Sequence, residues 1–221
     1  VSQMRFGTEQ SVAGRGHIHA MLLASSGMSA RASLRHDTAG VAAVRRIKAM
    51  DDGLEQAESR HDLAERLARL HDKLKGGLRH YNVVTEQRHF AEMAQALRPH
   101  MHQGHTERPF HLGRLQPRVR EAWIGNLAVN YCSQAHACVP PKHDDAAALA
   151  VLGGFMRNGF LHTAIREKGG AYGGGAGYDA ESGSFRFFSY RDPRLGETLE
   201  DFNRSVEWLV DNAHEDRTVD E

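Results

Sequence analysis

The chain has 221 residues, and its 28 lysines and arginines balance 28 aspartates and glutamates. This length allows one large domain or two small ones. The absence of net charge argues against electrostatic binding to nucleic acid or an anionic membrane, and the longest apolar run, residues 146–156, is too short to span a bilayer. We therefore expect no nucleic-acid partner and no membrane partner.

No basic and apolar leader opens the sequence, so a cytoplasmic location is expected, with an organelle matrix as the alternative. The chain begins with Val1 rather than Met, which simple processing or a trimmed tag would explain, as would a piece cut from a longer polypeptide. Such a piece would leave part of the protein's chemistry outside these residues.

The first half of the chain reads as mixed structure. Small residues are dense between Met21 and Ala43, so residues 1–50 are expected to form short strands and turns. An amphipathic helix is predicted over about 53–76, because leucines recur at spacings of four, three and four residues at Leu63, Leu67, Leu70 and Leu74. Residues 81–84 read as a strand, and residues 88–98 as a second helix.

Prolines between Pro99 and Pro117 mark the best domain boundary. We expect one unit over 1–98, a linker over 99–118 and a second unit over 119–221. Four histidines fall in the linker and are expected to be solvated rather than to bind metal: His100, His102, His105 and His111.

In the second unit we predict a strand over 123–129, a helix around 145–156, a shorter helix over 160–166 and two strands over 173–180 and 184–191. Asp192 and Pro193 are expected to begin the last helix, as N-cap and first helical residue. Its buried stripe would be Leu195, Leu199, Phe202, Val206 and Leu209. Strands in a run between helices predict the α+β class, a largely antiparallel sheet layered with helices.

The glycine pair Gly153-Gly154 lies inside one of these helices and either weakens it or marks close packing against a neighbour. The two cysteines, Cys132 and Cys138, are expected to be reduced, partly buried thiols. Structural zinc sites need four ligands, so a metal site built on these cysteines is disfavoured.

The most informative segment surrounds Tyr172. Six glycines lie between Gly169 and Gly177, and the preceding helix ends near Arg166. A guanidinium and a phenol are strong hydrogen-bond donors, and glycine-rich backbone can be approached closely by another chain. The pattern therefore predicts a site for an oxyanion or a peptide carbonyl.

The run 165–173, Ile-Arg-Glu-Lys-Gly-Gly-Ala-Tyr-Gly, resembles the arginine–tyrosine motif of the pitrilysin–insulinase family of inverted-motif zinc peptidases. Residues 189–193, Ser-Tyr-Arg-Asp-Pro, are similar to the presequence-protease branch. The resemblance is strongest over about 120–210. It implies that residues 119–221 are the front part of the last peptidase-like domain, and residues 1–98 the rear part of the one before.

The resemblance implies a zinc metalloendopeptidase that degrades unstructured oligopeptides. Its zinc would be bound by the N-terminal half of the same polypeptide, because neither H-x-x-E-H nor H-E-x-x-H occurs here, and this piece alone is expected to be inactive. Arg166 and Tyr172 would be the catalytic residues, as oxyanion donors. The peptide substrate would lie along backbone at Gly170, Ala171, Gly173 and Gly174.

Two other classes stay open. A relative that has lost its zinc motif would be an inactive scaffold or interaction domain. The glycine-rich loop could also cradle phosphate, although it matches neither G-x-G-x-x-G nor G-x-x-x-x-G-K-[ST] and precedes strands instead of opening a helix.

Overall fold

The computed structural model describes residues 1–77, 81–101 and 120–214. The chain divides into two compact units, one combining Val1–Asp51 with Leu112–Glu221 and one comprising Asp52–His111. Most of the expected linker lies outside the described residues, together with His102, His105 and His111. The assignment of 1–98 and 119–221 to two domains of a longer protein stays a prediction.

Residues 1–53 form three helices, α1 (Ser2–Ser25), α2 (Ala30–Ala39) and α3 (Val41–Gly53). The prediction of short strands and turns was wrong. The buried positions of α1 recur every third residue, but most of them are small or polar, so no apolar period is visible in the sequence: Gly16, His19, Leu22 and Ser25. The Ser29 side chain accepts a hydrogen bond from the Ala32 backbone N–H and caps α2.

A three-stranded antiparallel sheet forms the centre of the larger unit. It consists of β1 (Ser133–Ala137), β2 (Gly173–Asp179) and β3 (Ser184–Tyr190), in the order β1-β3-β2. Strand β3 pairs with both neighbours, with Ser133 opposite Phe188 and Gly173 opposite Tyr190. The predicted α+β class and the hairpin over 173–191 are confirmed.

The strand predicted over 123–129 was wrong, because β1 begins ten residues later. The apolar residues that suggested it are largely exposed, and Ile124 is 100% exposed. The strand that does form, Ser-Gln-Ala-His-Ala, has little apolar character of its own. The conformation of β1 is therefore set by its pairing with β3, that is, by tertiary context and not by local propensity.

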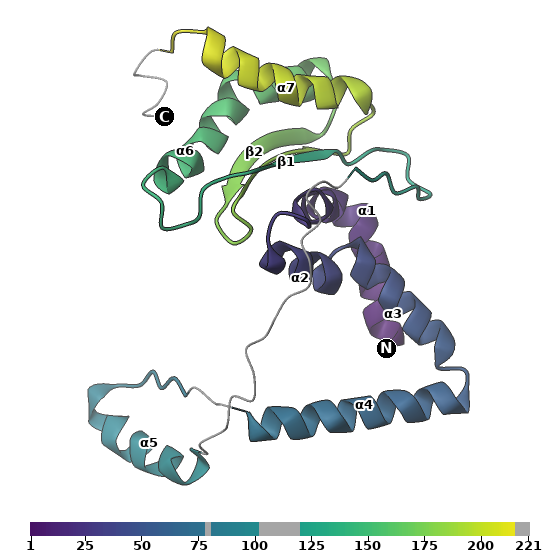
Figure 1. Ribbon diagram of the computed structural model, residues 1–221, viewed down its shortest axis with the longest axis vertical. Coiled ribbons are helices and arrows are strands. Elements are labelled where there is room, and N and C mark those ends of the chain that lie inside the picture. Colours follow the sequence, from purple (N-terminus) through teal and green to yellow (C-terminus); the bar gives the residue numbers. More distant parts are fainter. Residues whose placement is uncertain (78–80, 102–119, 215–221) are drawn as a thin grey trace. The chain divides into compact units, whose positions relative to one another are not determined.

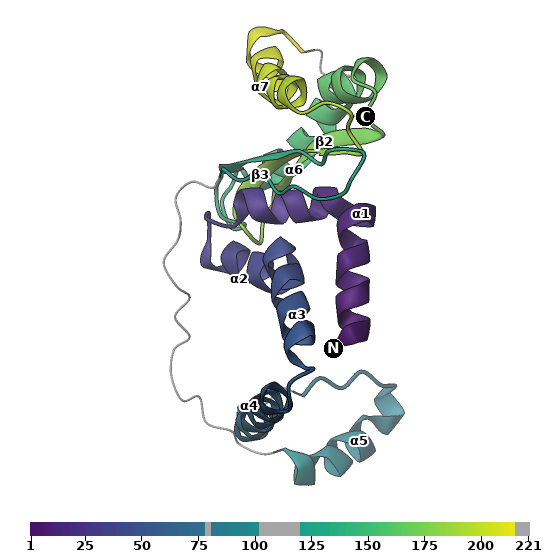
Figure 2. The same cartoon turned by 90° about the vertical axis from the view of Figure 1, so that its right-hand side faces the viewer.

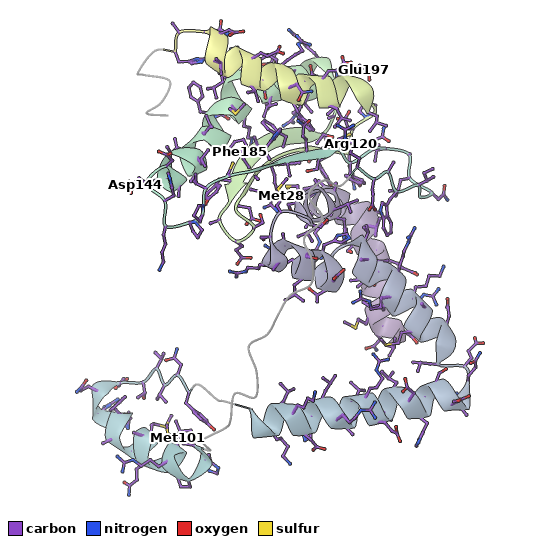
Figure 3. All side chains as sticks on the ribbon, viewed as in Figure 1. Met28, Met101, Arg120, Asp144, Phe185 and Glu197 are labelled. Atoms are coloured by element: carbon purple, nitrogen blue, oxygen red, sulfur yellow. The ribbon has the colours of Figure 1, made fainter. Side chains whose placement is uncertain are left out.

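Three helical segments cover one face of the sheet: α6 (Ala146–Met156), its continuation η3 (Arg157–Lys168), which has the wide π-helical pattern, and α7 (Gly196–Asp211) (Figure 1). Asp144 and Glu197 mark the N-terminal ends of α6 and α7 in Figure 3. The core lies between these helices and the sheet, and its fully buried members include Met156, Leu161, Ile165, Phe187 and Phe202.

Helix α1 packs against the opposite face of the sheet, where it contacts β1 and β3 (Figures 1 and 2). Side chains of β3 alternate between the two faces as expected for a strand. Phe187 stacks on Phe202 of α7, whereas Phe188 and Tyr190 contact His17 of α1. Strand β3 therefore joins the core on one side to the N-terminal helix on the other.

Helix α7 begins at Gly196, later than predicted, and Asp192 is not its N-cap. The backbone of Asp192 instead pairs with Asn130, which extends the sheet. Its buried carboxylate accepts hydrogen bonds from the Arg194 N–H and the Thr198 hydroxyl. The predicted stripe was partly wrong, since Phe202 is buried but Leu195, Leu199 and Val206 are exposed.

The smaller unit contains α4 (Ala57–Gly76) and α5 (Phe90–Leu97), flanked by the 3₁₀ turns η1 (Gln87–His89) and η2 (Arg98–His100). Both helices were predicted. Residues 81–84 do not form a strand, and Val84 is 91% exposed. Within the described part of the chain, no helix combines the length and apolar character needed to cross a bilayer.

Candidate functional site

Arg166 lies in the last turn of η3, where its side chain is exposed. Ile165 and Leu161 on the same segment are completely buried in the core, so the turn that carries Arg166 is firmly anchored. π-helical geometry is rare and recurs at functional sites. A cation in the last turn is also favoured by the helix dipole.

A tight turn connects η3 to β2 and places Tyr172 beside Arg166. The N–H of Gly170 donates to the Arg166 carbonyl oxygen and the N–H of Ala171 to that of Ile165, at 3.0 and 3.1 Å. Gly170 has a φ of +77°, which glycine adopts without strain. The N–H of Tyr172 donates to the carbonyl oxygen of Arg191, which ties the turn to the end of β3.

The predicted catalytic pair is brought together. The guanidinium carbon of Arg166 lies 5.9 Å from the centre of the Tyr172 ring, within cation–π range. Tyr172 is 66% exposed and Arg166 is also exposed. No hydrogen bond between described residues uses the Tyr172 hydroxyl or the Arg166 guanidinium, so both donors are accessible to a ligand.

Tyr172 is supported from the other side by residues that the sequence analysis did not assign to the site. The Tyr190 ring packs edge-on against Tyr172, with 5.5 Å between centres, and His17 of α1 packs edge-on against Tyr190 at 4.7 Å. Burial lowers the pKa of His17 below its ordinary 6.5, which favours a neutral ring here. Because α1 was not predicted as a helix, no signal in the sequence pointed to His17.

Arg191 is the one non-glycine residue of the described ranges with a positive φ, at 49°. Its guanidinium carbon lies 5.5 Å from the centre of the Tyr190 ring. A non-glycine residue in this region is uncommon and is held there by its surroundings. The carbonyl oxygen of Arg191 accepts the hydrogen bond from the Tyr172 N–H. The turn before β2 and the end of β3 therefore hold one another in place.

The four predicted substrate-binding residues differ in accessibility. Gly170 is exposed, and nothing lies within 4 Å of an ideal Cβ at Gly173, which begins β2. Ala171 is only 3% exposed, and a Cβ at Gly174 would approach Ile165 to 2.8 Å. Open space next to Tyr172 therefore lies at Gly173, and at the exposed Gly170 an added Cβ would only be in ordinary contact with Cγ of Pro193, at 3.6 Å. Strand β2 is at the edge of the sheet formed by the described residues, with β3 on one side.

The described residues do not offer a zinc site. Within 1–77, 81–101 and 120–214, no three histidine, cysteine or acidic side chains are grouped so as to hold a metal ion. Cys132 and Cys138 are free thiols, as expected. Burial is the main cause that raises the pKa of Cys132, which keeps this thiol protonated and unreactive.

Comparison with known proteins identifies relatives of the chain. Residues 120–220 match the family described as the PreP C-terminal domain. The mitochondrial presequence protease of Emericella nidulans is 32% identical over 97% of this chain and 21% of its own length, and that of Drosophila melanogaster is 31% identical over 92% and 20%. The mouse protein of the same name is 45% identical over 47% of this chain and 10% of its own length. The chain thus spans about a fifth or less of these relatives.

Proposed function

Because this chain belongs to the presequence-protease branch of the pitrilysin family, we propose that it serves a zinc metalloendopeptidase that degrades unstructured oligopeptides. Its own contribution is to position the substrate and to stabilise the oxyanion of the cleavage reaction. The observation that carries this proposal is the exposed pair of donors, Arg166 and Tyr172, beside the start of an edge strand, with the guanidinium carbon 5.9 Å from the centre of the tyrosine ring.

The chemistry of the two side chains suits this role. Attack of water on a peptide carbonyl places negative charge on the carbonyl oxygen, and donors fixed in advance stabilise that charge without reorganising. The Tyr172 hydroxyl donates one hydrogen bond while neutral, and Arg166 keeps its positive charge at any working pH. One such donor is typically worth about 2.7–4 kcal/mol in the transition state.

The substrate would lie in extended form beside β2. An extended peptide can add to the open edge of a sheet through main-chain hydrogen bonds. Gly170 and Gly173 leave room for this approach next to Tyr172, whereas Ala171 and Gly174 would contribute main-chain atoms alone. Zinc, when bound, supplies an activated water; we assign it to the N-terminal half of the longer polypeptide, which is the partner of this chain in the proposal.

For the cellular location, we propose an organelle matrix on the basis of the relatives' names. Their names place them in mitochondria, which supports the organelle matrix and gives no support to the cytoplasm that the sequence suggested. The alternative, an inactive scaffold, would have the same fold and the same donor pair. It would differ in having no measurable peptidase activity, so substitution of Tyr172 would change no kcat.

Tyr172→Phe in the full-length protein tests the proposal. We expect kcat to fall by about 100- to 1,000-fold, with the zinc content unchanged. Tyr178→Phe is the matched control, since Tyr178 lies further along β2 and its hydroxyl donates to the Val139 carbonyl oxygen at 2.8 Å. That variant should lose some stability and keep its kcat. An unchanged kcat in Tyr172→Phe would contradict the proposed role.

A further inference from the structure

A cavity of about 270 Å³ lies between η3 on one side and α7, with the segment that leads into it, on the other. Lys168 and Thr163 line it from η3, and Arg194 and Arg204 line it from the other side. Neither Arg166 nor Tyr172 contributes to its wall. The cavity is therefore distinct from the candidate site described above.

The cavity carries a surplus of positive charge. Its three cations are Lys168, Arg194 and Arg204, and its one acidic residue is Asp201. One oxygen of Asp201 accepts from Arg194 Nη2 at 3.0 Å and the other from Arg204 Nη1 at 3.1 Å. Three cations against one carboxylate leave two formal positive charges, and Lys168 has no ion-pair partner among the described residues.

Several donors in this cavity have no partner inside the described part of the protein. They are the Lys168 ammonium, the Thr163 hydroxyl and Nη1 of Arg194. Arg194 is held in place, because its Nη2 also donates to the Ala164 carbonyl oxygen at 3.3 Å. A ligand with acceptor oxygens would therefore meet donors that are already positioned, which reduces the cost of binding.

One wall of the cavity is apolar. It is formed by the Phe160 ring, and the guanidinium carbon of Arg204 lies 5.9 Å from the centre of that ring. An inorganic anion would leave this wall uncovered. A carboxylate on a short organic stem would place its oxygens on the cations and its methylene groups against the ring.

We propose that this cavity binds a carboxylate carried by a peptide, either an acidic side chain or the chain terminus. The arginines and Lys168 recognise the carboxylate oxygens, and Phe160 packs against the stem. The choice of a carboxylate rests on the charge and lining of the cavity, and the choice of a peptide as its carrier rests on the proposed function. The two can fail separately, because the kcat of Tyr172→Phe tests the function and ligand binding by Lys168→Gln tests the cavity.

Titration of the 221-residue chain with N-acetylglutamate at constant ionic strength tests the proposal, by calorimetry or by amide chemical shifts. N-acetylglutaminamide, in which both carboxylates are replaced by amides, is the neutral comparison. N-acetylglutamine keeps only the terminal carboxylate and N-acetylglutamate α-amide only the side-chain carboxylate, so these two ligands distinguish the two sources. Inorganic phosphate is the anion without a stem. We expect saturable binding of N-acetylglutamate that is weakened about tenfold in Lys168→Gln, the loss of one charge-assisted hydrogen bond. Lys142→Gln, at an exposed position outside the cavity, should bind as the unmodified chain does.

Lys168→Gln removes no side-chain hydrogen bond or ion pair between described residues, so circular dichroism should show an unchanged fold. Four results would overturn the proposal: no saturation with N-acetylglutamate, equal binding of the neutral N-acetylglutaminamide, tighter binding of phosphate, or an equal dissociation constant for Lys168→Gln and the unmodified chain.

Discussion

The contact of α6 with β2 depends on the absence of a side chain at Gly153. An ideal Cβ at this position would lie 2.7 Å from the carbonyl oxygen of Ala176 and 2.8 Å from Cα of Gly177. Both atoms belong to the backbone of β2, so no side-chain rotation can relieve the overlap. At the next residue, Gly154, nothing lies within 4 Å of the same position. Neighbouring glycines of one helix thus provide a perturbation and its matched control.

The expected magnitude follows from two opposing effects. Alanine in place of glycine favours a helix by about 1 kcal/mol, and this gain applies to Gly153→Ala and Gly154→Ala alike. Overpacking typically costs about 1–3 kcal/mol, and this cost applies to Gly153→Ala alone. We therefore expect Gly154→Ala to be more stable than the unmodified chain, and Gly153→Ala to be less stable than Gly154→Ala by about 1–3 kcal/mol.

Unfolding in urea, followed by the fluorescence of Trp123 and Trp208, measures this difference, because both tryptophans belong to the unit that contains α6. The melting temperatures of the two variants should differ by about 2–4 °C for each kcal/mol. Equal stability of Gly153→Ala and Gly154→Ala would refute the reasoning. It would mean that α6 can move away from β2 at no cost, so that the close approach does not hold the helix in place.

Two further predictions concern protonation and thiol reactivity. Burial is the main cause that lowers the pKa of His17, His19 and His36 below 6.5. On acidification these histidines therefore bind protons in the unfolded chain before they do so in the folded chain. The free energy of unfolding should decline as the pH falls below about 6.5. Melting temperatures measured from about pH 7.5 to about pH 5.5 check this prediction. The melting temperature should fall less in His17→Phe, and it should fall as in the unmodified chain in His61→Gln, a variant at an exposed site. A melting temperature that does not change with pH would contradict the prediction. Iodoacetamide should label the half-buried Cys138 in the folded chain and Cys132 only after unfolding, as peptide mapping by mass spectrometry would show, and rapid labelling of Cys132 would disprove its burial.

The parts of the fold that could be predicted are those whose information is local. Helix α4 follows from leucine spacing, and the β2–β3 hairpin from its turn and from the alternation of Phe185 and Phe187. Strand β1 and helix α1 could not be predicted in this way. The buried residues of α1 are mostly small or polar, such as His19, and no residue of β1 is more than partly buried. Both elements are fixed by the segments that pack on them and not by a hydrophobic pattern of their own.

The same distinction applies to the candidate site. Arg166 and Tyr172 are six residues apart, and the turn between them is closed by backbone hydrogen bonds within residues 165–172, so a short motif is enough to place both donors. The contacts that support the Tyr172 ring are not local. Tyr190 comes from the far strand of the hairpin, and His17 comes from a helix more than 150 residues earlier in the chain. A motif can therefore identify the two donors, but the rigidity that the proposed oxyanion stabilisation requires depends on long-range packing that the motif does not encode.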